Sequence, residues 1–312
     1  MKIVVTGALG HIGSRLVREL PFFIPGCEIV MVDNMMTQRY CSLFNLPDEG
    51  IYRFIEADIT QLELRPLLNG AHVVIHLAAI TDAAGSFDRA EQLEQNNFNA
   101  TKRLAEACAE FGVRLLTLSS TSVYGTQAEV VDENCTEEEL KPQSPYATTK
   151  LKEERLVQRL VQEKGLKASV YRFGTIFGVS PGMRFHTAVN KFCWQAAMGQ
   201  AITVWRTAYD QKRPYLDLSD AVRAIAFVIE KDIFTGLIYN VVTVNATVRQ
   251  VVDAIRTHVP ALEVTFVDNK IMNQLSYEVL NTRFARAGFE VLGNLEQGIA
   301  ESVALLSNAH RE

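Results

Sequence analysis

Cysteine is scarce in this sequence, and its few copies follow no pattern. The five cysteines are scattered, their number is odd, and no two of them stand in a Cys-x-x-Cys pair. This arrangement suggests neither a disulfide framework nor a cysteine-based zinc site. We therefore predict a chain with reduced thiols and no bound metal, which favours a cytoplasmic location.

Long apolar runs and clusters of basic residues are also missing. No apolar stretch approaches the roughly 18 residues that span a membrane, and the opening MKIVVTGALG is too short for a signal-peptide core. The formal net charge is −5, and no basic run suggests a surface for nucleic acid. We expect neither a membrane nor a nucleic acid among the partners. The hydrophobic content of 48% is sufficient for a substantial core.

What the sequence does contain is an alternation of apolar runs and helical patterns. Short runs rich in Val, Ile and Leu predict buried strands at 2–5, 27–33, 71–79, 113–120 and 167–174. Helical patterns lie between them, and the two longest end at Gly112 and Gly165, which are suitable C-caps. Runs without polar alternation suit a parallel sheet that is covered on both faces. The expected fold class is therefore α/β, with a doubly wound parallel sheet of the Rossmann type.

The pattern changes after about residue 178. A Pro/Gly loop is followed by shorter helices and strands, and no flexible Ser/Gly-rich linker separates the two parts. We expect a dinucleotide-binding domain over residues 1–178 and a smaller C-terminal α/β substrate-binding lobe over residues 179–312. Some segments of that lobe are expected to return to the first domain.

The segment TGALGHIG, residues 6–13, directly follows the first strand and opens the first helix. Gly7 permits a tight turn, Gly10 lets the backbone approach a pyrophosphate, and Gly13 lets the helix pack on the strand. The pyrophosphate would lie among the free N–H groups at the helix N-terminus. A simple glycine-rich turn is the alternative.

Two carboxylates follow the next apolar stretches. Asp33 ends the second strand, where a carboxylate accepts hydrogen bonds from adenosine ribose hydroxyls and repels a 2′-phosphate. NAD is therefore favoured over NADP, although Arg39 is close enough to matter. Asp58 could accept the adenine amino group, and a plain turn residue is as good an interpretation of it. Asp33 could likewise be a turn residue at the end of its strand.

The segment SPYATTK, residues 144–150, places Tyr146 and Lys150 four residues apart. On a helix the two side chains lie on one face. A free phenol, with a pKa of about 10, is a poor base at neutral pH, and a neighbouring ammonium favours the phenolate. Most such pairs are ordinary surface pairs, so the interpretation depends on the rest of the chain.

That context is a resemblance to a known family. The order and spacing of the motifs resemble those of extended short-chain dehydrogenases/reductases, and most closely the nucleotide-sugar epimerases and dehydratases of the UDP-galactose 4-epimerase type. The resemblance spans about residues 1–230, and it is carried by TGALGHIG, VDN, ADI, HLAA, SSTSVYG, SPYATTK and RPYLDLSD. It implies an NAD-dependent enzyme that acts on a nucleotide sugar, with a UDP-sugar favoured.

The resemblance also implies the roles of single residues. Tyr146 would be the acid/base, Lys150 would bind the nicotinamide ribose and favour the phenolate, and Ser120 would orient the reacting hydroxyl. Cofactor contacts are implied for Gly7, Gly10, His11, Ile12, Gly13, Asp33, Asn34, Asp58, Ile59, Leu77, Ala78, Ala79, Asn97, Tyr146 and Lys150. Substrate contacts are implied for Thr81, Ser120, Ser122, Tyr146, Thr175, Asn190 and Arg213.

Several of these positions allow a second interpretation or depart from the family pattern. Asn97 could bridge locally within its helix, and His76 is more simply a satisfied core histidine than a ligand. Thr81 stands where 4-epimerases have a Lys, and Thr175 stands where they often have an Asn, so the exact sugar is left open.

The expected reaction is epimerisation at C4 through a transient 4-keto sugar. A 4-ketoreductase or a decarboxylase is the main alternative, and a non-catalytic dinucleotide sensor is a remote one that the Tyr/Lys pair disfavours. A dehydratase is disfavoured because Thr121 and Ser122 occupy the places where dehydratases carry an acid pair.

A homodimer is also expected from the resemblance. Its interface would be formed by the helices over about 88–111 and 145–164, through apolar residues at helical spacing: Leu93, Leu104, Leu156 and Leu160. The alternative is that these leucines face the sheet of their own chain.

Overall fold

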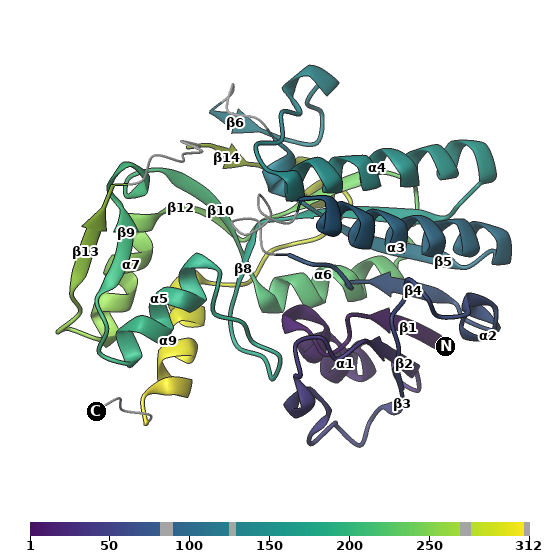
Figure 1. The fold of residues 1–312 in the computed structure, drawn as a ribbon, viewed down its shortest axis with the longest axis horizontal. Helices are drawn as coiled ribbons and strands as arrows, with labels where there is room; N and C mark the ends of the chain where they lie inside the picture. The colour runs from purple at the N-terminus through teal and green to yellow at the C-terminus, as the bar shows by residue number, and fades with distance from the viewer. Residues whose placement is uncertain (82–89, 125–128, 269–275, 309–312) are drawn as a thin grey trace.

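A seven-stranded parallel sheet is the centre of the protein. The computed structural model describes residues 1–81, 90–124, 129–268 and 276–308. In this part of the chain the sheet has the strand order β11-β7-β5-β4-β1-β2-β3 (Figure 1). The strands are β1 (Lys2–Thr6), β2 (Glu28–Asp33), β3 (Ile51–Glu56), β4 (Val73–His76), β5 (Arg114–Ser120), β7 (Ala168–Phe173) and β11 (Ile238–Val241).

The sheet is covered by helices on both faces, as the uninterrupted apolar strands predict. On one face lie α1 (His11–Phe23), α6 (Leu218–Glu230) and the short α8 (Thr282–Arg286). On the other lie α2 (Leu64–Leu68), α3 (Ala90–Phe111) and α4 (Pro145–Lys164). Successive side chains of a strand point to opposite faces. In β1, accordingly, Ile3 and Val5 join the first core and Val4 joins the second.

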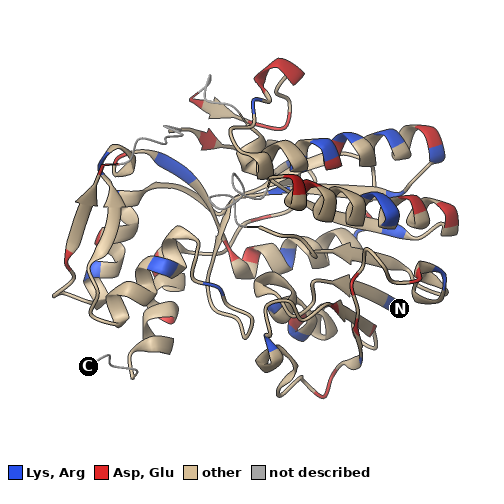
Figure 2. Ribbon diagram, viewed as in Figure 1, with Lys and Arg blue, Asp and Glu red and all other residues tan. Residues whose placement is uncertain are grey.

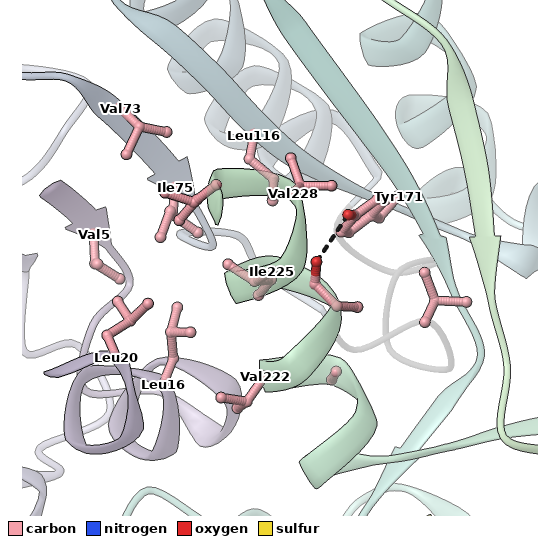
Figure 3. Packing of buried hydrophobic residues seen from close by; sticks show 14 of the residues in the cluster. Val5, Leu16, Leu20, Val73, Ile75, Leu116, Tyr171, Val222, Ile225 and Val228 are labelled. Carbon is pink, nitrogen blue, oxygen red and sulfur yellow. Dashed lines mark hydrogen bonds between the residues drawn. The ribbon is translucent and has the colours of Figure 1, made fainter. Parts of the chain in front are cut away.

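The first core depends on a helix from late in the chain. Figure 3 shows Leu16 and Leu20 of α1 lying near Val222 and Ile225 of α6, below the strands. The Tyr171 hydroxyl of β7 donates a hydrogen bond of 3.0 Å to the backbone carbonyl of Ala224 in α6. Segments beyond residue 178 therefore form part of the layer that supports the sheet.

The ends of the long helices follow the sequence closely. Gly165, in the left-handed conformation at φ +64°, is the C-cap of α4, and Gly112 directly after α3 has φ +67°. Both glycines stand where they were predicted to end a helix. At the other end of α4, the Ser144 hydroxyl accepts a 3.2 Å hydrogen bond from the backbone N–H of Ala147, so it is the N-cap.

A second lobe is built from the remaining elements. Its helices are α5 (Ala188–Ala197), α7 (Val248–His258) and α9 (Leu295–Leu306). Its strands are β8 (Thr175–Phe177), β10 (Lys212–Asp217) and β12 (Val244–Thr247) in one sheet, and β9 (Ile202–Trp205) with β13 (Val264–Val267) in another. A further strand pair joins β6 (Val130–Val131) to β14 (Glu278–Val279). Short 3-10 helices also occur in both parts of the protein: η1 (Tyr40–Leu43), η2 (Thr121–Val123), η3 (Glu137–Glu139) and η4 (Arg206–Ala208).

Two strands of the main sheet differ from the sequence prediction. β3 was not among the predicted strands, because the run IYRFIE contains Arg53 and Glu56 and lies at the sheet edge. β11, from the run LIYNVV, is one of the segments after residue 178 that return to the first domain, because it pairs in parallel with β7; the sequence did not show which segments would do so. An apolar run indicates a strand but does not say which sheet the strand joins.

The leucines expected at a dimer interface are buried within their own chain. Leu93, Leu104, Leu156 and Leu160 are at most 4% exposed, and the last three belong to the core under α2, α3 and α4. The expectation that these side chains face a partner is therefore wrong. Within the described residues no helix is long and apolar enough to cross a membrane.

Candidate active site

A cavity of about 570 Å³ lies at the carboxyl ends of the parallel strands, where ligands bind in open α/β sheets. It is lined by residues that immediately follow β1, β2, β3, β4, β5 and β7. The cavity brings together all but three of the residues predicted for the site: Gly7, Gly10, His11, Ile12, Gly13, Asp33, Asn34, Asp58, Ile59, Leu77, Ala78, Ala79, Thr81, Ser120, Ser122, Tyr146, Lys150 and Thr175.

The glycine loop between β1 and α1 is shaped so that no side chain fits at two of its positions. Gly7 has φ +66°, and a Cβ atom there would lie 2.7 Å from the backbone N of Ala78. A Cβ on Gly13 would lie 2.4 Å from the Gly7 carbonyl oxygen. Gly10 is the N-cap of α1, whose free N–H groups therefore open onto the cavity. This loop fits the pyrophosphate of a dinucleotide.

The Asp33 carboxylate is held at the rim of this loop. Its Oδ2 accepts a 3.1 Å hydrogen bond from the backbone N–H of Leu9, and its Oδ1 accepts one of 3.0 Å from Met35. Arg39 also lines the cavity. Burial lowers the pKa of the Arg39 guanidinium, and the charge of Asp33 opposes that effect. A cation and a carboxylate therefore stand together at the predicted ribose position.

Asp58 combines the two interpretations that the sequence left open. It lines the cavity, and its Oδ1 accepts hydrogen bonds of 2.8 Å and 2.7 Å from the backbone and hydroxyl of Thr60. These bonds lower the pKa of the carboxyl below its usual value. Asp58 is thus a turn residue whose fixed, ionised carboxylate still faces the cavity.

Tyr146, Lys150 and Ser120 all line the cavity. Tyr146 and Lys150 lie on the first two turns of α4, and the Lys150 ammonium is 5.9 Å from the centroid of the Tyr146 ring. Ser120 ends β5, and its oxygen accepts hydrogen bonds from the Ser122 backbone N–H at 3.2 Å and the Ser122 hydroxyl at 2.9 Å. All four side chains line the same cavity.

Lys150 has a partner that sequence reasoning missed. Its Nζ donates a 2.9 Å hydrogen bond to Oε2 of Glu153, and both side chains are buried. Burial alone would lower the pKa of Lys150, but the carboxylate of Glu153 and the phenol of Tyr146 raise it above its ordinary value. The i,i+3 spacing of Lys150 and Glu153 on a predicted helix was the signal available in the sequence.

Asn97 is not among the residues that line the cavity. It is buried in α3, where its side-chain oxygen accepts the Ile80 N–H at 2.8 Å and its amide donates to the Ile80 carbonyl at 2.9 Å. It therefore fixes the backbone after β4, and Ile80 and Thr81 of that segment do line the cavity. Residues 82–83, which follow HLAA and Thr81 in the chain, and Gly125 of SSTSVYG lie outside the described residues.

Asn190 and Arg213 also lie outside the cavity lining. Asn190 is fully buried in α5, where it accepts from the Gly178 N–H at 3.2 Å and donates to the Arg184 carbonyl at 3.1 Å. Arg213 of β10 donates to the Gln211 side chain at 2.9 Å. The segment from 183 to 192 does reach the cavity, but through Arg184, His186 and Thr187. Arg184 contacts the Thr81 hydroxyl.

Two of the histidines that line the cavity, His11 and His76, are buried and hydrogen-bonded. His76 shares a 2.7 Å hydrogen bond with the Thr6 hydroxyl, as expected of a satisfied core histidine. His11 shares one of 2.8 Å with the Ser180 hydroxyl. Burial is the main reason that the pKa of each falls to about 3, so both are neutral at neutral pH. Within the described residues no cluster of His, Cys, Asp and Glu could hold a metal ion.

Comparisons with known proteins agree with this geometry. A family model described as the NAD-dependent epimerase/dehydratase family matches residues 3–241. An uncharacterized UDP-glucose epimerase, YtcB, of Bacillus subtilis is 30% identical over all of this chain and 99% of its own length. The solved structure of MoeE5 in complex with UDP-glucuronic acid and NAD is 28% identical, with a TM-score of 0.83 over 99% of this chain and all of that one.

A third relative is longer than this chain. The trifunctional UDP-glucose 4,6-dehydratase/UDP-4-keto-6-deoxy-D-glucose 3,5-epimerase/UDP-4-keto-L-rhamnose-reductase RHM1 of Arabidopsis thaliana is 28% identical over 96% of this chain. The match covers 46% of the length of that protein. The relatives thus include both epimerases and dehydratases.

Proposed function

Because the chain belongs to the NAD-dependent epimerase/dehydratase family, we propose that it is an epimerase that inverts C4 of a UDP-sugar. The cofactor is NAD. The observation that carries the proposal is the meeting of Ser120, Tyr146 and Lys150 in the cavity that the glycine loop opens onto.

Each residue of this group has a part in the reaction. Bound NAD supplies a reversible hydride acceptor for the sugar C4. The Tyr146 phenolate takes the proton of the 4-hydroxyl as the carbonyl forms, and it returns that proton after the 4-keto sugar has presented its other face. Ser120 shares a hydrogen bond with the same oxygen, and the Lys150 ammonium favours the phenolate and binds the nicotinamide ribose.

The same cavity argues against a dehydratase. A dehydratase must move a proton from C5 and a hydroxide from C6, which needs an acid and a base beside the sugar. Thr121 is buried and its hydroxyl donates to the Phe173 carbonyl at 3.4 Å, while Ser122 carries a hydroxyl. Among the described lining residues the carboxylates are Asp33, which ends β2, and Asp58, which follows β3, and both belong to the proposed nucleotide side of the cavity.

The sugar contacts that we propose are Thr81, Ser122 and Thr175, which line the cavity. Arg184 joins them, since it contacts Thr81 and a guanidinium suits a phosphate or a carboxylate. Asn190 is then a supporting residue, because its side chain donates a hydrogen bond to the backbone carbonyl of Arg184.

Two copies of the chain are also proposed to pair through α3 and α4. The support is the family resemblance alone, because the leucines first assigned to the interface are buried. Figure 2 shows residues of both charges along the two helices, and Lys152 of α4 pairs with Glu94 of α3 at 2.6 Å. Such an interface would be largely polar.

The proposal is tested by turnover without added reductant. Purified protein is incubated with UDP-glucose, UDP-galactose or UDP-glucuronic acid, and the products are resolved by NMR. An epimerase yields the C4 epimer to an equilibrium ratio and leaves the NAD level constant. Loss of carbon dioxide from UDP-glucuronic acid would identify a decarboxylase, and a 4-keto-6-deoxy product would identify a dehydratase. In a parallel reaction with added NADH, stoichiometric use of the NADH would identify a ketoreductase.

A further inference from the structure

A buried carboxylate contacts the lysine of the catalytic group. Glu153 lies one turn after Lys150 on α4, and its Oε2 is 2.9 Å from the Lys150 Nζ. The two side chains are 3% and 6% exposed. Solvent therefore screens this ion pair little, and the charge of Glu153 acts strongly on its surroundings.

The neighbouring charges have other partners. Glu154, the next residue of α4, is bound by Arg172 of β7 through two hydrogen bonds of 2.9 Å and 2.6 Å. His76 of β4 also faces Lys150, and burial together with Lys150 lowers its pKa to about 3, so it is neutral. Glu153 is therefore the negative charge in direct contact with the ammonium in the described part of the chain.

The second oxygen of Glu153 has no hydrogen-bond partner among the described residues. The hydroxyl of Thr101, from α3, faces this carboxylate. Burial raises the pKa of the Glu153 carboxyl, and the Lys150 ammonium opposes that effect. Such a group is costly to bury for stability alone, because each ion of a buried pair loses its hydration.

We propose that Glu153 is a positioning residue: it holds the Lys150 ammonium in place and offsets part of the positive charge felt by Tyr146. This inference rests on the proposed function, in which Tyr146 is base and then acid within one turnover. An ammonium has three N–H donors, and one is used by Glu153, which leaves two for the ribose and the phenol. A phenol held too strongly as phenolate would return its proton slowly, so the offset serves the second half of the reaction.

The test compares two buried carboxylates of the same helix. Glu153→Gln keeps the size and removes the charge, so the uncompensated ammonium favours the phenolate. We expect the acidic limb of the kcat–pH profile to move about one unit towards lower pH. Glu154→Gln is the matched control, because it removes an equally buried carboxylate that binds Arg172 and not Lys150. It should lower the melting temperature and move the limb by much less, because Glu154 acts on Lys150 only from a distance.

A purely structural role would give a different result. Glu153→Gln would then lower the melting temperature without moving the limb, and the inference would be overturned. If the Gln variant does not fold, Glu153→Asp replaces it: a carboxylate drawn back by one methylene should move the limb in the same direction by less, and an unmoved limb would overturn the inference.

A binding measurement keeps this outcome separate from the proposed function. Calorimetry on protein stripped of nucleotide should show that Glu153→Gln binds NAD about fivefold more weakly, because the neutral amide holds the Lys150 ammonium less firmly than a carboxylate does. Glu154→Gln should bind NAD as the wild type does. Equal affinities in all three proteins contradict the positioning role, whereas a wild type that binds NAD but converts no UDP-sugar contradicts only the proposed function.

Discussion

Replacing Asp33 tests how the cavity selects its cofactor. The carboxylate is fixed by the backbone N–H groups of Leu9 and Met35 at the position expected for the adenosine ribose. It should accept hydrogen bonds from the ribose hydroxyls of NAD and repel the 2′-phosphate of NADP. We predict that NAD binds at least tenfold more tightly than NADP, a difference of about 1.4 kcal/mol.

The magnitude follows from the charges at this position. A 2′-phosphate carries about two negative charges. At about 5 Å from the carboxylate, the repulsion is about 1.7 kcal/mol with the dielectric constant of water and about 7 kcal/mol with an effective value of 20. Arg39, which lines the cavity beside Asp33, would attract the 2′-phosphate and so offset part of this repulsion. A net preference of at least tenfold, about 1.4 kcal/mol, therefore requires Arg39 to offset only a small part of the repulsion.

The assay is calorimetry with both cofactors on protein stripped of nucleotide. Asp33→Ala should narrow the preference, mainly by weakening NAD. Arg39→Ala is the complementary variant: it should widen the preference by weakening NADP several-fold while NAD changes little. Equal affinity of the wild type for the two cofactors would refute the reasoning, because Arg39 would then outweigh Asp33.

Three further predictions concern the base, acid stability and assembly. Tyr146→Phe should lower kcat about 10²-fold with an unchanged melting temperature, and near-normal turnover would remove the phenol from the mechanism. The free energy of unfolding should fall as the pH drops from about 6.5 towards 3, by up to about 1.4 kcal/mol per pH unit for each of His11 and His76. The reason is that these histidines bind a proton near pH 6.5 in the unfolded chain and only near pH 3 in the folded chain. Equal free energies of unfolding in urea titrations at pH 7 and pH 5 would contradict this. Sedimentation at micromolar concentration should show a dimer, and a monomer alone would contradict the proposed pairing of α3 and α4.

The parts of the fold that local sequence determines were predictable. Continuous apolar runs gave β1, β2, β5 and β7 to within one residue of their observed limits, whereas β4 (Val73–His76) is shorter than the predicted 71–79. β3 was not predicted as a strand, because Arg53 interrupts its apolar run and Glu56 ends it. These polar residues fit an edge strand, in which Ile51 is 61% exposed. The place of β11 depends on pairing with a strand about 70 residues earlier, which no local pattern encodes.

The residues of the site also include some that the sequence revealed and some that it did not. Gly7 and Gly13 could be recognised because the backbone itself requires glycine at both positions, and Gly10 through its spacing from them. Arg39 was noted because it lies close to Asp33 in the sequence, but Arg184 was not, because it reaches the cavity only through the path of the chain between elements. Asn190 was placed on the correct segment, but its side chain turns inward to bind the backbone of that segment.

The late arrival of β11 has a consequence for synthesis on the ribosome. β7 is the edge of the sheet until Ile238–Val241 pairs with it, and α6 is needed to cover the first core. At roughly 5–20 residues per second, translation leaves this edge unpaired for at least about 3 seconds. An unpaired apolar edge can recruit strands from other chains, so the nascent protein should depend on chaperones during this interval. A fragment that ends at residue 178 should aggregate for the same reason.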